Sequence, residues 1–180
     1  MAFSPRVVVP ALLVCCGGEG AADTAAPADP RDAAVLADMA SWVWSDRDPE
    51  PSHDPGSGPC AASAYGLEGS VLEVDTGLCS YAVLEQPLLA DLRQGESIEL
   101  VWWHNQLVAE EQALGHVLLV ADGEVLYERE VPIPSEPLAY TEVVEVAADV
   151  PEGAALVLHL HNHGANAWSF LRIERLAPTR

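Results

Sequence analysis

The stretch HVLLVADGEVLYEREV, residues 116–131, places Asp122-Gly123 between two runs rich in Val, Leu and Tyr. An Asp-Gly pair favours the two-residue turn that joins antiparallel strands, because both central residues of that turn adopt positive φ. The flanking runs have the length and the branched and aromatic side chains typical of strands. The stretch therefore predicts a β-hairpin, and it indicates an antiparallel fold.

Short apolar runs separated by turn residues continue on both sides of this hairpin. The chain from Gly69 onward keeps no sustained helical period, and only residues 106–114 suggest a brief helix. The predicted strands cover residues 70–75, 80–85, 97–104, 116–121, 124–131, 141–147, 155–162 and 167–176. About eight short strands without room for crossover helices predict an all-β fold, an antiparallel two-sheet β-sandwich of the jelly-roll type.

The N-terminus, residues 1–16, has the layout of a short secretory signal. Arg6 precedes an apolar run that ends before Cys15 and is shorter than the roughly 20 residues needed to span a membrane. The segment LVCCGG resembles the bacterial lipobox, in which a cysteine is lipidated after cleavage, and Cys16 is the expected lipid anchor. Cys15 departs from the usual Gly, Ala or Ser, so plain secretion or an unprocessed N-terminal strand stay as alternatives.

A tether is expected between this signal and the sandwich. Residues 17–59 are acidic and rich in Pro, Gly and Ala, which predicts a flexible segment, with a short helix or strand over 33–44. Residues 60–180 form the predicted folded domain. We therefore expect an extracytoplasmic lipoprotein, in the periplasm or at the cell surface, that touches the membrane only through its lipid.

The charge balance narrows the classes of partner. The chain has 28 acidic and 8 basic residues, for a formal net charge of −20. Such a surface repels phosphate backbones, so we expect no nucleic-acid partner.

Two of the four cysteines, Cys60 and Cys79, lie inside the predicted domain. In an oxidising exterior we expect them to form a disulfide, whose closed loop would contribute about 3 kcal/mol on the chain-entropy model. Two buried thiols are the alternative.

The stretch ALVLHLHNHGANAWSFLRIERL, residues 155–176, contains the side chains that suggest a function. Pairing it as a hairpin around Gly164-Ala165 places four apolar residues on one face and four ring-bearing residues on the other. The predicted core face has Leu156, Leu158, Leu171 and Ile173. The predicted outward, ligand-binding face has His159, His161, Trp168 and Phe170.

That outward face has three interpretations. Aromatic rings beside polar groups suit a glycan, since sugars stack C–H faces on rings and hydrogen-bond through their hydroxyls. Histidines two apart on a strand can instead share a copper or zinc ion. The candidate ligands for such an ion are His104, His116, His159, His161 and His163. The third interpretation is packing alone, with no ligand and a structural role in the envelope.

The strand run, the Cys60/Cys79 pair and the closing strand AWSFLRIERL resemble galactose-binding-like jelly-roll domains of secreted bacterial proteins, over about residues 60–176. The resemblance implies a carbohydrate-binding or similar adhesive module. Apart from the copper or zinc ion considered above, we expect no cofactor. Trp102 and Trp103 are neighbours on a predicted strand, so one is expected in the core and the other outside, where it would extend an aromatic surface, pack or cover a sheet edge.

The segment His159–Gly164 also resembles the His-x-His-x-x-Gly pattern of copper type II monooxygenases. Those enzymes need a downstream methionine ligand, and the two methionines here, Met1 and Met39, lie upstream. The sequence has no nucleophile elbow, phosphate-binding glycine loop or His-Glu-x-x-His motif. We therefore predict a non-enzymatic binding module, with a carbohydrate as the candidate ligand. The alternatives are an extracytoplasmic metal-binding protein and a structural lipoprotein.

Overall fold

Alternating burial along the strands separates the side chains of the interior from those of the surface. The computed structural model describes residues 31–50, 58–77 and 79–178. In β6 (Ser97–His104) every second side chain is buried, beginning with Ile98 and ending with His104. Because side chains alternate across a strand, one face of β6 fills the core and the other is partly exposed.

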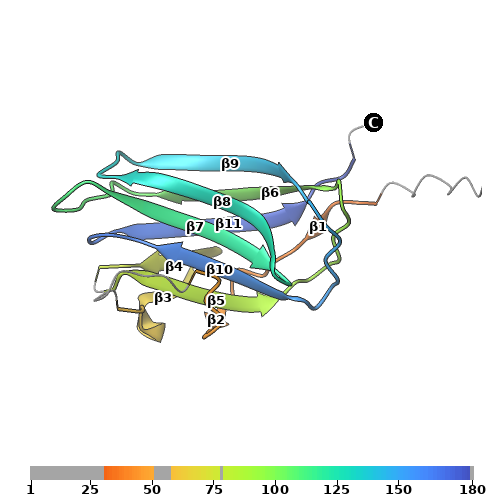
Figure 1. The fold of residues 1–180 in the computed structure, drawn as a ribbon, viewed down its shortest axis with the longest axis horizontal. Helices are drawn as coiled ribbons and strands as arrows, with labels where there is room; N and C mark the ends of the chain where they lie inside the picture. Colours follow the sequence, from red (N-terminus) through yellow and green to blue (C-terminus); the bar gives the residue numbers. More distant parts are fainter. Residues whose placement is uncertain (1–30, 51–57, 78, 179–180) are drawn as a thin grey trace, which may run out of the picture.

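Two antiparallel sheets enclose that core (Figure 1). Sheet A contains, in spatial order, β3 (Tyr65–Glu68), β4 (Val71–Asp75), β11 (Ala167–Arg175), β6 and β9 (Leu138–Glu145), with β1 (Ala34–Val35) also paired to β11. Sheet B contains β2 (Val43–Trp44), β5 (Tyr81–Pro87), β10 (Ala155–His161), β7 (Ala113–Ala121) and β8 (Glu124–Ile133). A single 3₁₀ turn, Ala62–Ala64, precedes β3.

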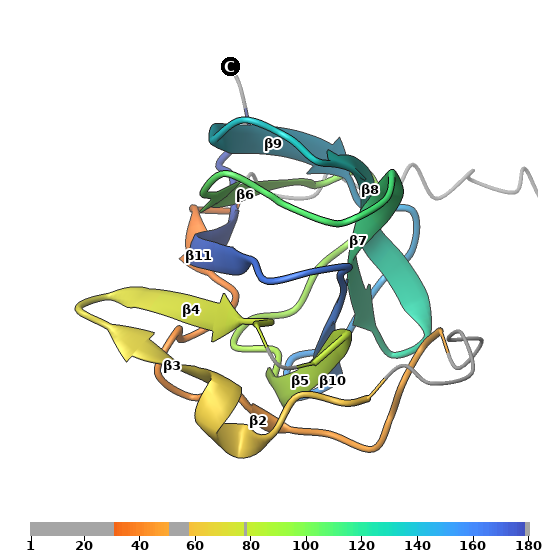
Figure 2. The same ribbon diagram turned by 90° about the vertical axis from the view of Figure 1, so that its left-hand side faces the viewer.

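The strand order is that of a jelly roll. The pairs β7–β8, β6–β9, β5–β10 and β4–β11 are nested, so the chain resembles one long antiparallel ribbon rolled into two layers. Figure 2 shows the two layers facing each other. The predicted two-sheet sandwich is confirmed.

The β7–β8 hairpin forms the tip of that ribbon, as its turn sequence predicts. Asp122 has φ 51° and Gly123 has φ 84°, the positive values that an Asp-Gly turn supplies. By contrast, the helix predicted over 106–114 is wrong. Leu107 bridges Ser135 in extended backbone, and β7 already begins at Ala113.

The hairpin predicted over residues 155–176 is also wrong. β10 lies in sheet B between β5 and β7, whereas β11 lies in sheet A between β4 and β6. Residues 162–166 carry the chain from one sheet to the other. Asn166 donates to Asn162 Oδ1 at 2.8 Å and accepts from the Val108 N–H at 2.7 Å, which holds this connection in place.

Residues 31–50 belong to the sandwich, so a flexible tether is wrong for this part of 17–59. β1 pairs with β11 and β2 pairs with β5, so the short strand suggested within 33–44 is present as two. Leu36, which follows β1, and Trp42, which precedes β2, are buried in the core.

The N-terminal chain enters beside the end of the last strand. Arg31 forms an ion pair with Asp91 at 2.6 Å and a second one with Glu96, and its hydrogen bond lowers the pKa of Asp91. Arg175 donates to the backbone oxygen of Asp91 at 2.7 Å. The first described residue, Arg31, is thus fixed at the end of the sandwich where β11 ends.

A disulfide joins Cys60 to Cys79, as predicted, and ties the segment before β3 to the segment before β5. The predicted signal peptide, with Cys16, lies outside the described residues. Within the described ranges, the chain contains no helix of the length and apolar character needed to cross a membrane.

Candidate functional sites

The predicted ligand-binding face does not exist as a surface. Trp168 is 0% and Phe170 3% exposed, and both fill the core beside Trp102, at ring-centroid distances of 6.1 Å. His159 and His161 lie on the other sheet, where His159 is 0% exposed. The prediction failed because the chain changes sheet after β10. As a result, the side chains of β11 that face the core are Trp168 and Phe170.

Trp103 is the tryptophan that faces outward, as expected for one member of the Trp102-Trp103 pair. It is partly exposed on the outer face of sheet A, while Trp102 is fully buried against Tyr140. Its partners on the two neighbouring strands are Ala139 and Ser169, both small. Ala139 is exposed and Ser169 is buried.

Carboxylates lie on the same face as Trp103, two strands away. Ser169 pairs with Trp103 on one side and with Glu73 on the other, so Glu73 and Trp103 are separated by about 10 Å of sheet. Glu68, Glu73 and Asp75 line a hollow of about 300 Å³ over β3 and β4. Burial raises the pKa of Glu73, and the nearby Glu68 carboxylate raises it further.

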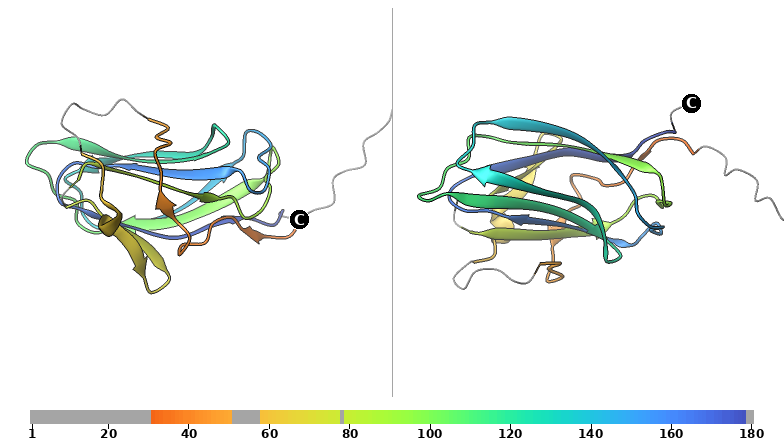
Figure 3. Two further views of the ribbon diagram at one scale, coloured as in Figure 1. Left: turned by 90° about the horizontal axis from the view of Figure 1, so that it is seen from below. Right: turned by 45° about the horizontal axis from the view of Figure 1, so that its top comes forward.

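A second group of polar side chains lies on the outer face of sheet B. Residues 45–50, here called the strap, follow β2 and cross the strands of this sheet (Figures 2 and 3). The Ser45 N–H bonds the Val83 oxygen of β5, Asp48 reaches His159 of β10, and Glu50 reaches His116 of β7.

The strap forms a cluster with two buried or half-buried histidines. Glu50 Oε2 lies 2.6 Å from His116 Nδ1 and 3.5 Å from His159 Nε2. The other nitrogen of each ring also faces a carboxylate: His159 Nδ1 lies 2.9 Å from Asp48 Oδ1, and His116 Nε2 lies 3.0 Å from Glu128 Oε1. One donor atom from each of Glu50, His116 and His159 falls within 4.8 Å of the others, so the three residues could hold a metal ion.

The structure separates the five predicted histidine ligands. His116 and His159 come together, and His161 pairs with His116 in the strand register, but its ring stacks on His163 at 4.9 Å. His104 lies on the core side of sheet A, with Nδ1 2.7 Å from the Asn105 oxygen. Of the two partners expected from other strands, His116 therefore lies with His159, whereas His104 lies in the other sheet.

Two members of the cluster, Asp48 and Glu50, lie outside the set of histidines that the sequence predicts as metal ligands. Both belong to the segment DRDPEPSHDPGSGP, whose composition resembles a linker. The signal available was position: the two carboxylates lie within six residues of Trp44, and so they lie close to a strand end.

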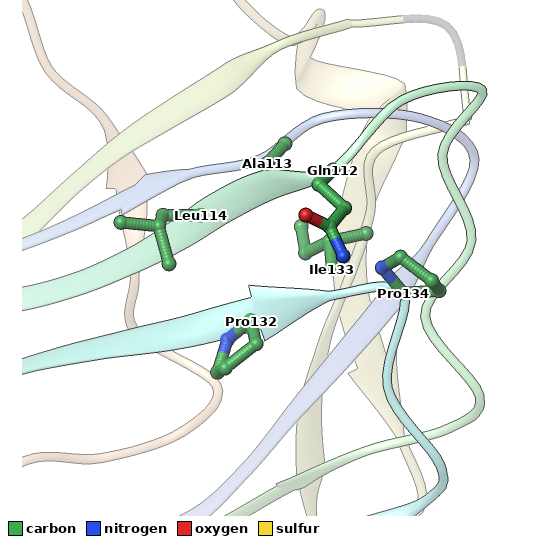
Figure 4. A pocket seen from close by; sticks show the side chains of 6 residues that line it. All are labelled: Gln112, Ala113, Leu114, Pro132, Ile133 and Pro134. Atoms are coloured by element: carbon green, nitrogen blue, oxygen red, sulfur yellow. The ribbon is translucent and has the colours of Figure 1, made fainter.

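A hollow of about 440 Å³ lies at the ends of β7 and β8, where Leu114 is 50% exposed (Figure 4). Its lining is Gln112, Ala113, Leu114, Pro132, Ile133 and Pro134. Gln112 supplies the polar side chain of this lining. A single amide offers little to orient a polar ligand, in contrast to the groups beside Trp103 and around Glu50.

The chain matches no known family profile and no curated protein. Among solved structures it is similar to a family 4 carbohydrate-binding module, with 11% identity over 78% of this chain and 89% of that chain and a TM-score of 0.46. It is also similar to a family 61 module solved with β-1,4-galactotriose, with 8% identity over 64% and 77% and a TM-score of 0.38. A third similar structure is the K3 adhesin domain of Lys-gingipain from Porphyromonas gingivalis, with 13% identity over 79% of this chain and 98% of that chain and a TM-score of 0.43.

Proposed function

We propose that this chain is an exported, non-catalytic module that binds a neutral glycan on the outer face of sheet A. The observation that carries the proposal is the partly exposed Trp103 between the small side chains of Ala139 and Ser169. A partly exposed aromatic ring accepts the C–H face of a sugar. The carboxylates of the neighbouring hollow accept hydrogen bonds from its hydroxyl groups.

The charge of the chain supports a neutral sugar. A formal net charge of −20, with Glu68, Glu73 and Asp75 on the proposed face, repels uronic acids and sulfated sugars. A neutral polysaccharide meets no such repulsion, and its hydroxyls are suitable donors to carboxylates.

We further propose that a lipid on Cys16 holds the module to a membrane from the extracytoplasmic side. The Cys60–Cys79 disulfide supports an oxidising compartment, because disulfides persist there and are rare in the cytosol. A glycan of the envelope or its surroundings fits this placement. The lipobox resemblance of LVCCGG supports the anchor.

Affinity electrophoresis of the exported protein tests the glycan proposal. Gels contain soluble β-1,4-galactan, xylan, mixed-linkage β-glucan or dextran. We expect at least one of these to retard the protein, and Trp103→Ala to weaken the binding by about tenfold or more through loss of stacking. Trp103→Phe keeps an aromatic ring and should retain part of the retardation.

Leu114→Ala is the matched control, because Leu114 is exposed but lies in the hollow of Figure 4. It should migrate as the parent protein does in every gel. Retardation that Trp103→Ala leaves intact would refute the proposed face. Free migration of the parent protein in all four polysaccharides would refute the proposed function and favour a structural role.

A further inference from the structure

The strap places two carboxylates over two imidazoles on the outer face of sheet B, far in the fold from Trp103. We propose that Glu50, His116 and His159 form a binding site for a divalent transition-metal ion, with Zn²⁺ the ion that best suits their donor atoms. Two imidazole nitrogens and one carboxylate oxygen are a donor set that zinc accepts, with a fourth position left for water.

The spacing of the donor atoms fits such an ion. Ligand atoms 2.0–2.2 Å from a tetrahedral ion lie about 3.3 Å from one another. His159 Nε2 and Glu50 Oε2 are 3.5 Å apart. His116 Nδ1 and Glu50 Oε2 are 2.6 Å apart, so this pair must open by less than about 1 Å when an ion replaces the proton between them.

The second nitrogen of each imidazole is already held by a carboxylate. Asp48 faces His159 Nδ1 at 2.9 Å, and Glu128 faces His116 Nε2 at 3.0 Å. Histidines that bind metals commonly donate their other N–H to a carboxylate, which fixes the tautomer and orients the ring. Here each ring has a carboxylate oxygen within 3.0 Å of one nitrogen, and the other nitrogen lies within 3.5 Å of Glu50 Oε2.

Burial and charge also favour a cation. The His159 side chain is 0% exposed, whereas that of Glu50 is 39% exposed. The site therefore has one buried ligand and one ligand that solvent can reach. Asp48, Glu50 and Glu128 bring three negative charges to two imidazoles. The nearby Arg47 and Arg129 form ion pairs with other residues, Glu85 and Glu142. A divalent ion would offset this excess charge.

Equilibrium dialysis against ZnCl₂, followed by metal analysis, tests the site on the exported protein after treatment with EDTA. We expect one Zn²⁺ per chain. Glu50→Gln and His116→Gln remove a ligand and should weaken binding by at least about 100-fold, while Asp48→Asn removes support only and should weaken it by about 10- to 100-fold. Co²⁺ in place of Zn²⁺ should give the visible absorption of a tetrahedral site.

His163→Gln is the matched control, because His163 stacks on His161 and contributes no atom to the three-residue group. It should bind Zn²⁺ as the parent protein does. Far-UV circular dichroism checks that each variant is folded. The proposal is overturned if the parent protein binds no more Zn²⁺ than His116→Gln, or if His163→Gln loses as much affinity as His116→Gln; the first outcome would mean that the cluster only fastens the strap.

Discussion

Glu73 projects from β4 onto the outer face of sheet A, beside Glu68 and near Asp75. Burial raises its pKa above the ordinary value of 4.5, and the two neighbouring carboxylates raise it further. The folded state therefore holds the Glu73 proton more tightly than the unfolded chain does. Its contribution to stability is present below the unfolded pKa and is lost as the pH rises through the folded pKa.

Glu73→Gln should therefore stabilise the protein at pH 7 and leave stability nearly unchanged at pH 4. The gain should stay below about 1 kcal/mol, since the side chain is only partly buried and its charge is screened by solvent. Urea unfolding at the two pH values measures the difference. Glu124→Gln, at the exposed first residue of β8, is the control with no expected change. A loss of stability at pH 7 in Glu73→Gln would contradict the assigned cause.

At the scale of elements, alternation and turn residues were enough to predict most strands. β6 matches its predicted span, and the Asp122-Gly123 turn lies where its sequence places it. The sheet to which each strand belongs is not a local property, and this is why the His159–Phe170 face failed. A jelly roll puts its last two strands in different sheets, so the predicted fold and the predicted hairpin were incompatible.

The strand register follows a regularity that resolves this conflict. Three cross-strand pairs, Leu100↔Glu142, Leu84↔Leu158 and Val74↔Trp168, are each placed symmetrically about Ala121, beside the hairpin turn. Equal counting outward from the turn therefore gives β5 as the partner of β10. The sequence predicted the two histidines of the metal cluster as ligands but not Glu50, because Glu50 reaches them on a segment that crosses three strands.

The connection between β10 and β11 passes close to Val108, and a substitution at Gly164 tests this contact. Gly164 has φ 86°, and a Cβ built on it would lie 2.0 Å from the Val108 oxygen. Gly164→Ala should destabilise the fold by at least about 2 kcal/mol, through backbone strain and this collision. Gly153 has a similar φ of 82° but an open surrounding, so Gly153→Ala should cost about 1 kcal/mol. Equal losses in urea unfolding would argue against a close approach of the connection to Val108.

For the whole molecule, the two proposed sites lie on opposite outer surfaces. Trp103 belongs to sheet A, and Glu50 lies over sheet B, with the core between them. A glycan and a metal ion would therefore not compete for the same contacts. The proposed attachment to a membrane depends on the N-terminal segment, where the sequence predicts a lipid on Cys16.

Cys16→Ser should abolish incorporation of radiolabelled palmitate in cells that express the full chain, because the thiol of that residue is the predicted attachment point. The released protein should then appear in the soluble fraction. Cys15→Ala is the control: it places a usual lipobox residue before the acceptor and should keep the label. Label retained by Cys16→Ser, or absent from the parent protein, would count against the anchor.

The ion pairs of Arg31 distinguish the two ends of the sandwich. They fix the incoming chain at the end where β6 begins, whereas Trp103 lies near the other end of the same strand, about 20 Å away. The turn-rich rim that includes the start of β7 lies at that far end as well (Figure 1). In a protein anchored through Cys16, Trp103 would therefore lie toward the end of the sandwich that is remote from the point where the chain enters it.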